Sequence, residues 1–253
     1  MEYVPIIPHG AEGRVKLPGD RLFCFADIAV KDKVYHDYYK NTQKEVLLDH
    51  PVYELEPALG VMETVSLIQS LEPDITTVPD KHEDYETTRS MFFEYAPAMR
   101  GRVPGLRLMG VPQGTTPGQI LFSAQEMARS GLVDMLGIGI KRSIPDLDRA
   151  ALIQQISSQF PRMRYHLLGA RWPYLNEHEA AQDERVESLD SAEPVSIALK
   201  GRYFRDATAP DTKRRPDFHQ TAELAVVLRG LIWDNSIDMH RVLNYGWHVI
   251  LEE

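Results

Sequence analysis

Eight short apolar runs, each followed by a polar turn and a helical pattern, constrain the fold of this chain more than any other feature. The runs are almost continuously apolar and rich in β-branched residues, which is typical of strands buried on both faces of a parallel sheet. Their alternation with helices predicts βα units joined by right-handed crossovers. The expected strands cover residues 3–7, 21–30, 45–49, 74–80, 106–111, 133–140, 164–170 and 186–190.

The helices between these runs are best marked in the middle of the chain, within residues 116–131. Thr116 stands where an N-cap is expected, Pro117 suits the first helical position, and Gly131 is a natural C-terminal stop. Apolar residues at helical spacing predict two further helices, within residues 57–73 and 144–161.

These units predict an α/β protein, a single (β/α)₈ TIM-type barrel that occupies residues 1–253 without a zinc-binding subdomain. The length suits one such domain, and an open doubly wound sheet is the alternative. Residues 45–204 would contain the strand-end site. Residues 205–220 form a polar loop, and residues 217–253 are expected to contain closing helices.

Composition indicates an ordinary globular protein, with 43% hydrophobic and 26% charged residues. No apolar run is long enough to span a membrane, and the N-terminus lacks a signal-peptide pattern. Cys24 is the single cysteine, which rules out an internal disulfide and a cysteine-based zinc site. A reducing cytoplasm is therefore the expected compartment, that of the host if the gene belongs to a phage.

The formal net charge of −9 argues against a protein that coats long nucleic acid with a basic face. A local basic cluster nevertheless follows the last expected strand, where it would lie beside the mouth of a barrel. It is either a solvated loop or a set of phosphate contacts. Its members are Lys200, Arg202, Lys213, Arg214 and Arg215.

The active site of such a barrel lies at the C-terminal ends of its strands. Aspartate and glutamine side chains there can bind the hydrogen-bonding edge of a purine-like base, and glycines let the backbone approach it. Two carboxylates can also divide a displacement at a sugar carbon, one as nucleophile and the other as proton carrier. The residues at the expected strand ends are Asp49, Asp80, Gln113, Gly137, Gly139, Gly169 and Asp190.

The segments around these strand ends are "ITTVPDKHEDYETT", "LMGVPQG", "MLGIGI", "YHLLGARWP" and "SLDSAEPVSIALKGRY". They resemble the corresponding segments of a known family, the tRNA-guanine transglycosylases, especially the archaeosine type. The resemblance covers residues 45–204, and its nearest group is the phage and bacterial enzymes that insert 7-deazaguanine bases into DNA.

The resemblance implies that Asp190 is the nucleophile that bonds to C1′ and that Asp49 is the general acid/base. It implies base recognition by Asp80 and Gln113, with backbone contacts from Gly137 and Gly139. The chain departs from the family after Asp49, where His-Pro-Val-Tyr replaces a Ser-Gly-Gly-Phe type of loop. It also lacks the zinc motif and the RNA-binding domain of the tRNA enzymes, which favours DNA over tRNA as the substrate.

The expected activity is therefore exchange of guanine in nucleic acid for a 7-deazaguanine such as preQ0, by double displacement and without a metal or other cofactor. The expected partners are nucleic acid and the 7-deazaguanine base, and a homodimer stays open. One rival is an enzyme that cleaves N-glycosidic bonds of free nucleosides with water. Another is a non-catalytic subunit that partners an active transglycosylase.

Each site residue also has a simpler structural interpretation. An aspartate at a strand end often caps a helix or forms a turn, so Asp49 could cap the next helix and Asp84 could be an N-cap near Asp80. Gly137 and Gly139 could be glycines for reasons of packing alone. His166 is expected to be a packed strand residue, since the histidines are not at metal-ligand spacing.

Overall fold

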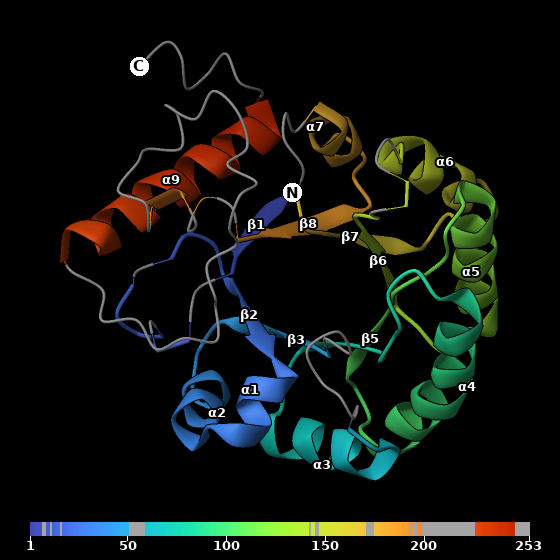
Figure 1. The fold of residues 1–253 in the computed structure, drawn as a ribbon, viewed down its shortest axis with the longest axis horizontal. Coiled ribbons are helices and arrows are strands. Elements are labelled where there is room, and N and C mark those ends of the chain that lie inside the picture. Colours follow the sequence, from blue (N-terminus) through green and yellow to red (C-terminus); the bar gives the residue numbers. More distant parts are fainter. Residues whose placement is uncertain are drawn as a thin grey trace.

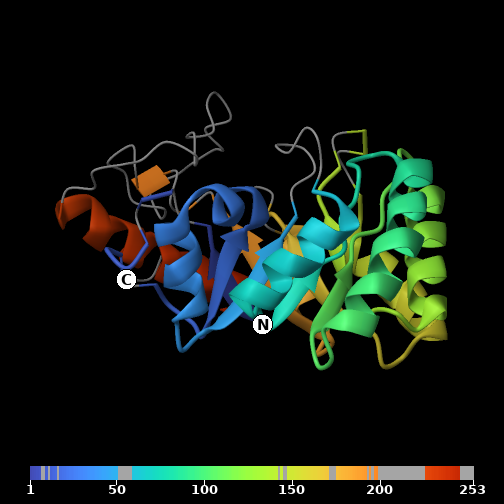
Figure 2. The ribbon, with the colours of Figure 1, turned by 90° about the horizontal axis from the view of Figure 1, so that it is seen from below.

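The computed structural model describes residues 1–6, 9–10, 12–15, 17–50, 59–141, 143–144, 147–170, 175–192, 194, 197–198 and 226–245. Within them, eight parallel strands form a nearly closed barrel, and helices pack around its outside (Figures 1 and 2). The predicted α/β (β/α)₈ barrel is therefore confirmed, and the doubly wound alternative was wrong.

All eight expected strands are present, in the order β1-β8-β7-β6-β5-β4-β3-β2 around the barrel. β1 and β2 lie side by side, but no ladder joins these two described strands. The strands are β1 (Glu2–Pro5), β2 (Arg21–Phe25), β3 (Glu45–Asp49), β4 (Ile75–Thr77), β5 (Arg107–Gly110), β6 (Met135–Gly139), β7 (Arg164–Leu168) and β8 (Val186–Ser191).

A side chain bridges the seam between β1 and β2. The Oε1 atom of Glu2 accepts hydrogen bonds from the backbone N–H groups of Asp20 at 2.7 Å and Arg21 at 2.8 Å. Gly19 makes room for this contact, because a Cβ on it would lie 2.7 Å from Glu2 Oε1, and its φ of +76° also suits glycine. The carboxylate thus replaces part of the missing ladder at the start of β2.

Helices follow β2 to β7 as expected, whereas the described residues between β1 and β2 form no helix; two strand boundaries differ from the expected ones by three or more residues. The run 21–30 is a strand only to Phe25, because residues 26–30 continue as α1, and continuous apolarity does not distinguish the two structures. The run 74–80 is a strand only to Thr77, and Pro79 cannot donate to a ladder. The helices are α1 (Ala26–Lys31), α2 (Lys33–Lys40), α3 (Val61–Leu71), α4 (Tyr85–Arg102), α5 (Pro117–Ser130), α6 (Arg149–Gln159), α7 (Leu175–Ala181) and α9 (Val226–Tyr245).

The caps that the sequence predicted for α5 are confirmed. The Thr116 side chain accepts a hydrogen bond from Gln119 N, Pro117 is the first helical residue, and Gly131 ends the helix with a φ of +68°. Asp84 caps α4 through a hydrogen bond from Thr87 N. The structural interpretation of Asp84 was therefore correct, and it leaves Asp80 available for another role.

The inside of the barrel is layered, because alternate residues of each strand point inward. Its middle layer is apolar and consists of Val4, Phe23, Leu47, Ile75, Met109 and Met135. Below it, toward the strand starts, charged side chains pair across strands: Arg21 Nη2 lies 2.5 Å from Glu45 Oε2, and Arg107 Nη2 lies 2.7 Å from Glu187 Oε2. The polar strand ends lie above it, so the apolar layer separates two polar zones.

The closing helix α9 packs against β1 and α7 on the outside of the barrel (Figure 1). Asn235 of α9 donates a hydrogen bond to the carbonyl oxygen of Pro194 at 3.1 Å, which ties the helix to the chain beyond β8. Within residues 217–253, where closing helices are predicted, the structure describes one helix, α9, and the other residues of this range lie outside the described part. Among the described helices, none combines the length and apolarity needed to cross a membrane.

Candidate active site at the barrel mouth

The sequence-predicted site residues that the structure describes follow the C-terminal ends of five strands. Asp49 ends β3 and Gly139 ends β6, while Asp190 is the penultimate residue of β8. Asp80 and Gln113 lie in the loops after β4 and β5, and Gln113 donates to the Asp80 carboxylate. Because the strands are parallel, these residues share one end of the barrel.

Asp190 is a buried carboxylate, 4% exposed, with two hydrogen bonds on one oxygen. Its Oδ1 atom lies 2.9 Å from Nε2 of His166 and accepts the backbone N–H of Gly169 at 3.1 Å. Within the described part of the chain, Oδ2 has no hydrogen-bond partner. The β7 strand therefore orients the carboxylate through Oδ1 and leaves Oδ2 as the oxygen that can react.

A chain of hydrogen bonds leads from the barrel interior to Asp190. Arg21 Nη1 donates to Ser188 Oγ at 2.6 Å, and Ser188 Oγ lies 2.7 Å from His166 Nδ1. Arginine only donates, so the serine proton is free to point at Nδ1, and the histidine proton then lies on Nε2, facing Asp190. His166 is fully buried, as the sequence led us to expect, but it also orients the candidate nucleophile.

Half-buried Asp80 and buried Gln113 form a second polar cluster, across the barrel from Asp190. Gln113 Nε2 donates to Asp80 Oδ2, and Gln113 Oε1 accepts the backbone N–H of Glu83 at 2.9 Å. Burial raises the pKa of the Asp80 carboxyl to about 6, although the Lys141 charge and the Gln113 hydrogen bond oppose that shift. The two residues that the resemblance assigns to base recognition therefore touch each other.

Lys141 completes this cluster and was not predicted from the sequence. Its Nζ atom donates to Gln113 Oε1 at 2.6 Å, and the side chain is 1% exposed. Burial lowers the pKa of Lys141 to about 8, while the charges of Asp80 and Glu83 oppose the shift and that of Arg149 adds to it. The cluster thus combines an acid, an amide and an ammonium group from three consecutive loops.

Asp49 lies at the mouth with β1 and β2 between it and Asp190. It alternates with the inward-facing Leu47, so its half-buried side chain belongs to the inner face of the barrel. The next described helix, α3, is capped at Gly60, so Asp49 does not cap it. Residues 51–58, which include most of the loop that departs from the family, lie outside the described part.

The histidine after Asp49 is buried and polar. The backbone N–H of His50 donates to Thr77 Oγ1 at 2.8 Å, whereas its Nε2 atom has no partner among the described residues. Burial lowers the pKa of His50 to about 4, so the ring is neutral at physiological pH. This neutral ring stands in place of the serine that the resembled family carries.

The two GIG glycines differ in what surrounds them. A Cβ on Gly137 would lie 2.8 Å from Leu168 Cδ1 and 3.1 Å from Met109 Sδ, so the packing of these side chains by itself favours a glycine there. A Cβ on Gly139 would lie 3.4 Å from Lys141 Nζ, which places this residue beside the polar cluster. Their backbone contacts with a base remain predictions.

Arg149 joins the ends of two neighbouring strands at the mouth, β6 and β7. Its Nη1 atom donates to the carbonyl oxygens of Ile138 at 3.1 Å and Gly169 at 2.9 Å, at the ends of β6 and β7. Its Nη2 atom lies 2.6 Å from Glu177 Oε1, and both charged side chains are buried. The arginine therefore links the end of β6, which leads to Lys141, to the end of β7, where Gly169 donates a hydrogen bond to Asp190.

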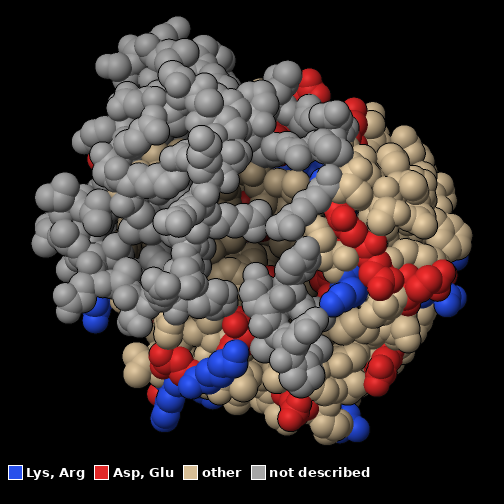
Figure 3. Space-filling view, viewed as in Figure 1, with Lys and Arg blue, Asp and Glu red and all other residues tan. Residues whose placement is uncertain are grey.

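The predicted phosphate contacts Lys200, Arg202, Lys213, Arg214 and Arg215 lie outside the described residues. On the face in Figure 3, described acidic and basic side chains are interspersed around the rim. No group of three or more His, Cys, Asp or Glu side chains in the described part is arranged to hold a metal ion.

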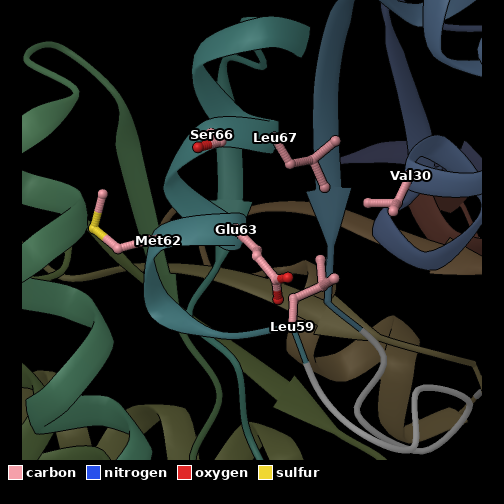
Figure 4. A pocket seen from close by; sticks show the side chains of 6 residues that line it. All are labelled: Val30, Leu59, Met62, Glu63, Ser66 and Leu67. Carbon is pink, nitrogen blue, oxygen red and sulfur yellow. The ribbon is translucent and has the colours of Figure 1, made fainter.

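A separate pocket of about 380 Å³ lies on the outside of the barrel, between α1 and α3 (Figure 4). It is mainly apolar, and the carboxylate at its edge, Glu63, already accepts the backbone N–H of Gly60 at 2.9 Å. It contains none of the strand-end residues and is not the candidate active site. Its lining residues are Val30, Leu59, Met62, Glu63, Ser66 and Leu67.

Two residues of the site, His166 and Lys141, were missed in the sequence. Their positions could have indicated a role in the site. His166 lies within β7, which ends at the mouth, and Lys141 comes shortly after the end of β6. Comparison of the chain with models of known protein families gave no match, and comparison with curated proteins gave none either.

Proposed function

We propose that the protein is a base-exchange transglycosylase that replaces guanine in nucleic acid, DNA in preference to tRNA, with a 7-deazaguanine such as preQ0. One observation carries the proposal: the buried Asp190 carboxylate receives hydrogen bonds from the described residues on Oδ1 only, and it lies across the barrel from a largely buried cluster of hydrogen-bonding groups. A nucleotide between them would present its C1′ to the carboxylate and its base to the cluster.

The proposed reaction is a double displacement. Asp190 Oδ2 attacks C1′, the C1′–N9 bond breaks, and guanine leaves with the electron pair and a proton from Asp49. The incoming base then gives its N9 proton to Asp49 and attacks C1′, which releases the Asp190 carboxylate. Two displacements retain the configuration at C1′. The scheme requires no metal or redox cofactor, and the nucleotide must leave the base stack.

The residues around each aspartate support this division of roles. Donors on Asp190 Oδ1 hold the group in place without occupying the attacking oxygen, as a nucleophile requires. Asp49 is half-buried at the same mouth, where it can exchange protons with an entering base. The basic residues after β8 would provide the phosphate contacts that an acidic protein needs locally.

A base-exchange assay tests the proposal. DNA and, separately, tRNA with labelled guanine would be incubated with the protein and preQ0, and released guanine and incorporated preQ0 would be measured. We expect exchange in DNA with the wild type and none with Asp190→Ala. The matched control is Asp183→Ala, because Asp183 lies before β8, away from the mouth, and pairs with Arg185.

The outcomes separate the rival functions. Exchange in tRNA alone would keep the chemistry and overturn the preference for DNA. Guanine release without incorporation, with free nucleosides as the better substrates, would indicate the hydrolytic rival. Exchange that survives in Asp190→Ala would contradict the assigned nucleophile, and inactivity of the wild type on every substrate would favour the partner-subunit alternative.

A further inference from the structure

Lys141 is a buried ammonium group that contacts no counter-ion among the described residues. Its side chain is 1% exposed, and its Nζ atom makes one hydrogen bond among the described residues, to the neutral amide oxygen of Gln113. No described carboxylate lies within 4 Å of Nζ. Burial of a charge without an ion-pair partner costs several kcal/mol. If Lys141 served packing alone, no contact would offset this free-energy cost. We therefore expect a group of a bound ligand to accept hydrogen bonds from Nζ.

The buried Arg149 shows what a structural cation in the same region looks like. It pairs directly with Glu177 at 2.6 Å, and its remaining donors bind backbone carbonyl oxygens. Its donors therefore have acceptors inside the protein. Lys141 differs because two of its three N–H donors have no acceptor among the described residues.

The hydrogen-bonding capacity of the cluster defines the ligand group. Gln113 Oε1 already accepts from Lys141 Nζ and from Glu83 N, which uses both of its lone pairs. Gln113 Nε2 donates to Asp80 Oδ2, which leaves Asp80 Oδ1 without a partner in the described part. The groups without a described partner are therefore a carboxylate acceptor, the second N–H of the Gln113 amide and an ammonium donor, held together by that amide.

An acceptor beside a donor matches the edge of a lactam, in which a ring N–H adjoins a carbonyl. In guanine this edge consists of N1–H and O6, with the 2-amino group as a further donor. Gly139 keeps the space beside Nζ clear, because a Cβ on it would lie 3.4 Å from that atom. A 6-amino group in place of O6 would direct a donor at the ammonium group, which has no acceptor to offer.

From these contacts we infer that Lys141 binds the O6 carbonyl of the base and makes the site select 6-oxopurines over 6-aminopurines. The inference rests on the proposed function, which places the base at Asp80 and Gln113. The same contact acts in the reaction, because the electron pair of the breaking C1′–N9 bond spreads over the base as far as O6. An ammonium group fixed at O6 stabilises that charge as it develops.

Equilibrium binding of free bases to the full chain tests this role without relying on turnover. Three bases with the same 2-amino group differ at position 6 and, with it, at N1: guanine has an oxo group beside N1–H, 2,6-diaminopurine an amino group beside a bare N1, and 2-aminopurine a hydrogen beside a bare N1. With wild type we expect calorimetry to show guanine binding about 10- to 100-fold tighter than 2,6-diaminopurine, the range for a hydrogen bond to a charged group. Lys141→Met should lose the part of this preference that O6 supplies and keep the part that N1–H supplies at Asp80, while 2-aminopurine affinity changes less than about threefold.

A second variant, Lys141→Gln, distinguishes the loss of the base contact from a folding defect in Lys141→Met. Lys141→Gln retains a neutral donor and should keep part of the preference for guanine, with a circular dichroism spectrum that matches wild type. If either folded variant discriminates between guanine and 2,6-diaminopurine as well as wild type does, the inference is overturned. It is equally overturned if the wild type shows no preference.

The failure of this inference and the failure of the proposed function give different results. Exchange activity that depends on Asp190, with unchanged discrimination in Lys141→Met, would overturn the role of Lys141 alone. Reduced discrimination in Lys141→Met, with no exchange by wild type on any nucleic acid, would keep the base contact and overturn the transglycosylase.

Discussion

The Nε2 atom of His166 lies 2.9 Å from the Oδ1 atom of Asp190, and both side chains are buried. Ser188 holds the other ring nitrogen at 2.7 Å and is itself held by Arg21 at 2.6 Å. The orientation of the candidate nucleophile therefore depends on a chain of donors that begins in the charged layer below the apolar core. A contact far below the mouth thus bears on the chemistry proposed at the mouth.

The first prediction concerns His166→Gln, whose amide can replace only part of this chain. We expect the turnover rate of base exchange to fall about 10²- to 10³-fold because the attacking carboxylate is less well oriented. The KM for the nucleic acid should change less than about threefold, since Asp80 and Gln113 still bind the base. Single-turnover and steady-state rates would measure both quantities.

Tyr165→Phe is the matched control for that variant. Tyr165 is the preceding residue on β7 and points to the other face, where its hydroxyl lies 2.7 Å from Ser157 Oγ. Its exchange rate should stay close to that of wild type. A His166→Gln protein with a raised KM and an unchanged turnover rate would contradict the positioning role.

The second prediction is a bell-shaped dependence of kcat/KM on pH. Asp80 must be ionised to accept a hydrogen bond from the base, and its pKa is about 6. Lys141 must be protonated to donate, and burial lowers its pKa to about 8, with Arg149 adding to the shift and Asp80 and Glu83 opposing it. Activity should therefore rise near pH 6 and fall near pH 8. Lys141→Met should lose the alkaline limb, and a limb that persists would show that another group titrates there.

The third prediction is that the base cluster lowers the stability of the fold. The raised pKa of Asp80 means that stability falls as the pH rises from 3.8 toward about 6. The lowered pKa of Lys141 means that stability falls as the pH decreases from 10.5 toward about 8. At pH 7 both groups are thus held in their charged forms at a cost in folding free energy.

Replacement of both groups should relieve this cost. We expect the double variant Asp80→Asn, Lys141→Met to have a free energy of unfolding at pH 7 about 1–4 kcal/mol above that of wild type, measured in urea. Lys141→Met alone should gain less, because it leaves the Asp80 charge without its opposing cation. Equal or lower stability of the double variant would show that the cluster supports the fold.

The fourth prediction contrasts Gly137→Ala with Gly139→Ala. The first change places a Cβ within 2.8 Å of Leu168 Cδ1 inside the barrel and should cost about 1–3 kcal/mol of stability. The second places a Cβ at 3.4 Å from Lys141 Nζ and should leave stability nearly unchanged while base binding weakens. Urea unfolding and calorimetry would separate the two effects, and equal destabilisation by both would contradict the assignment.

The sequence by itself determined the strand–helix alternation and hence the barrel. Strand burial and helix caps are local patterns. The strand at residues 45–49 and the Thr116 cap can therefore be predicted without knowledge of any distant residue. The same logic located Asp49, Gln113 and Asp190 at strand ends, because parallel strands in a barrel bring those ends to one face.

Only the tertiary structure decided which of these polar groups have partners and which do not. His166 reaches Asp190 because β7 and β8 are neighbours, and Lys141 reaches Gln113 because the loops after β5 and β6 are adjacent. Such contacts join residues 24 and 28 positions apart and leave no periodic trace in the sequence. The charge of a buried side chain is therefore visible in the sequence, whereas its partner is set by the packing of separate strands.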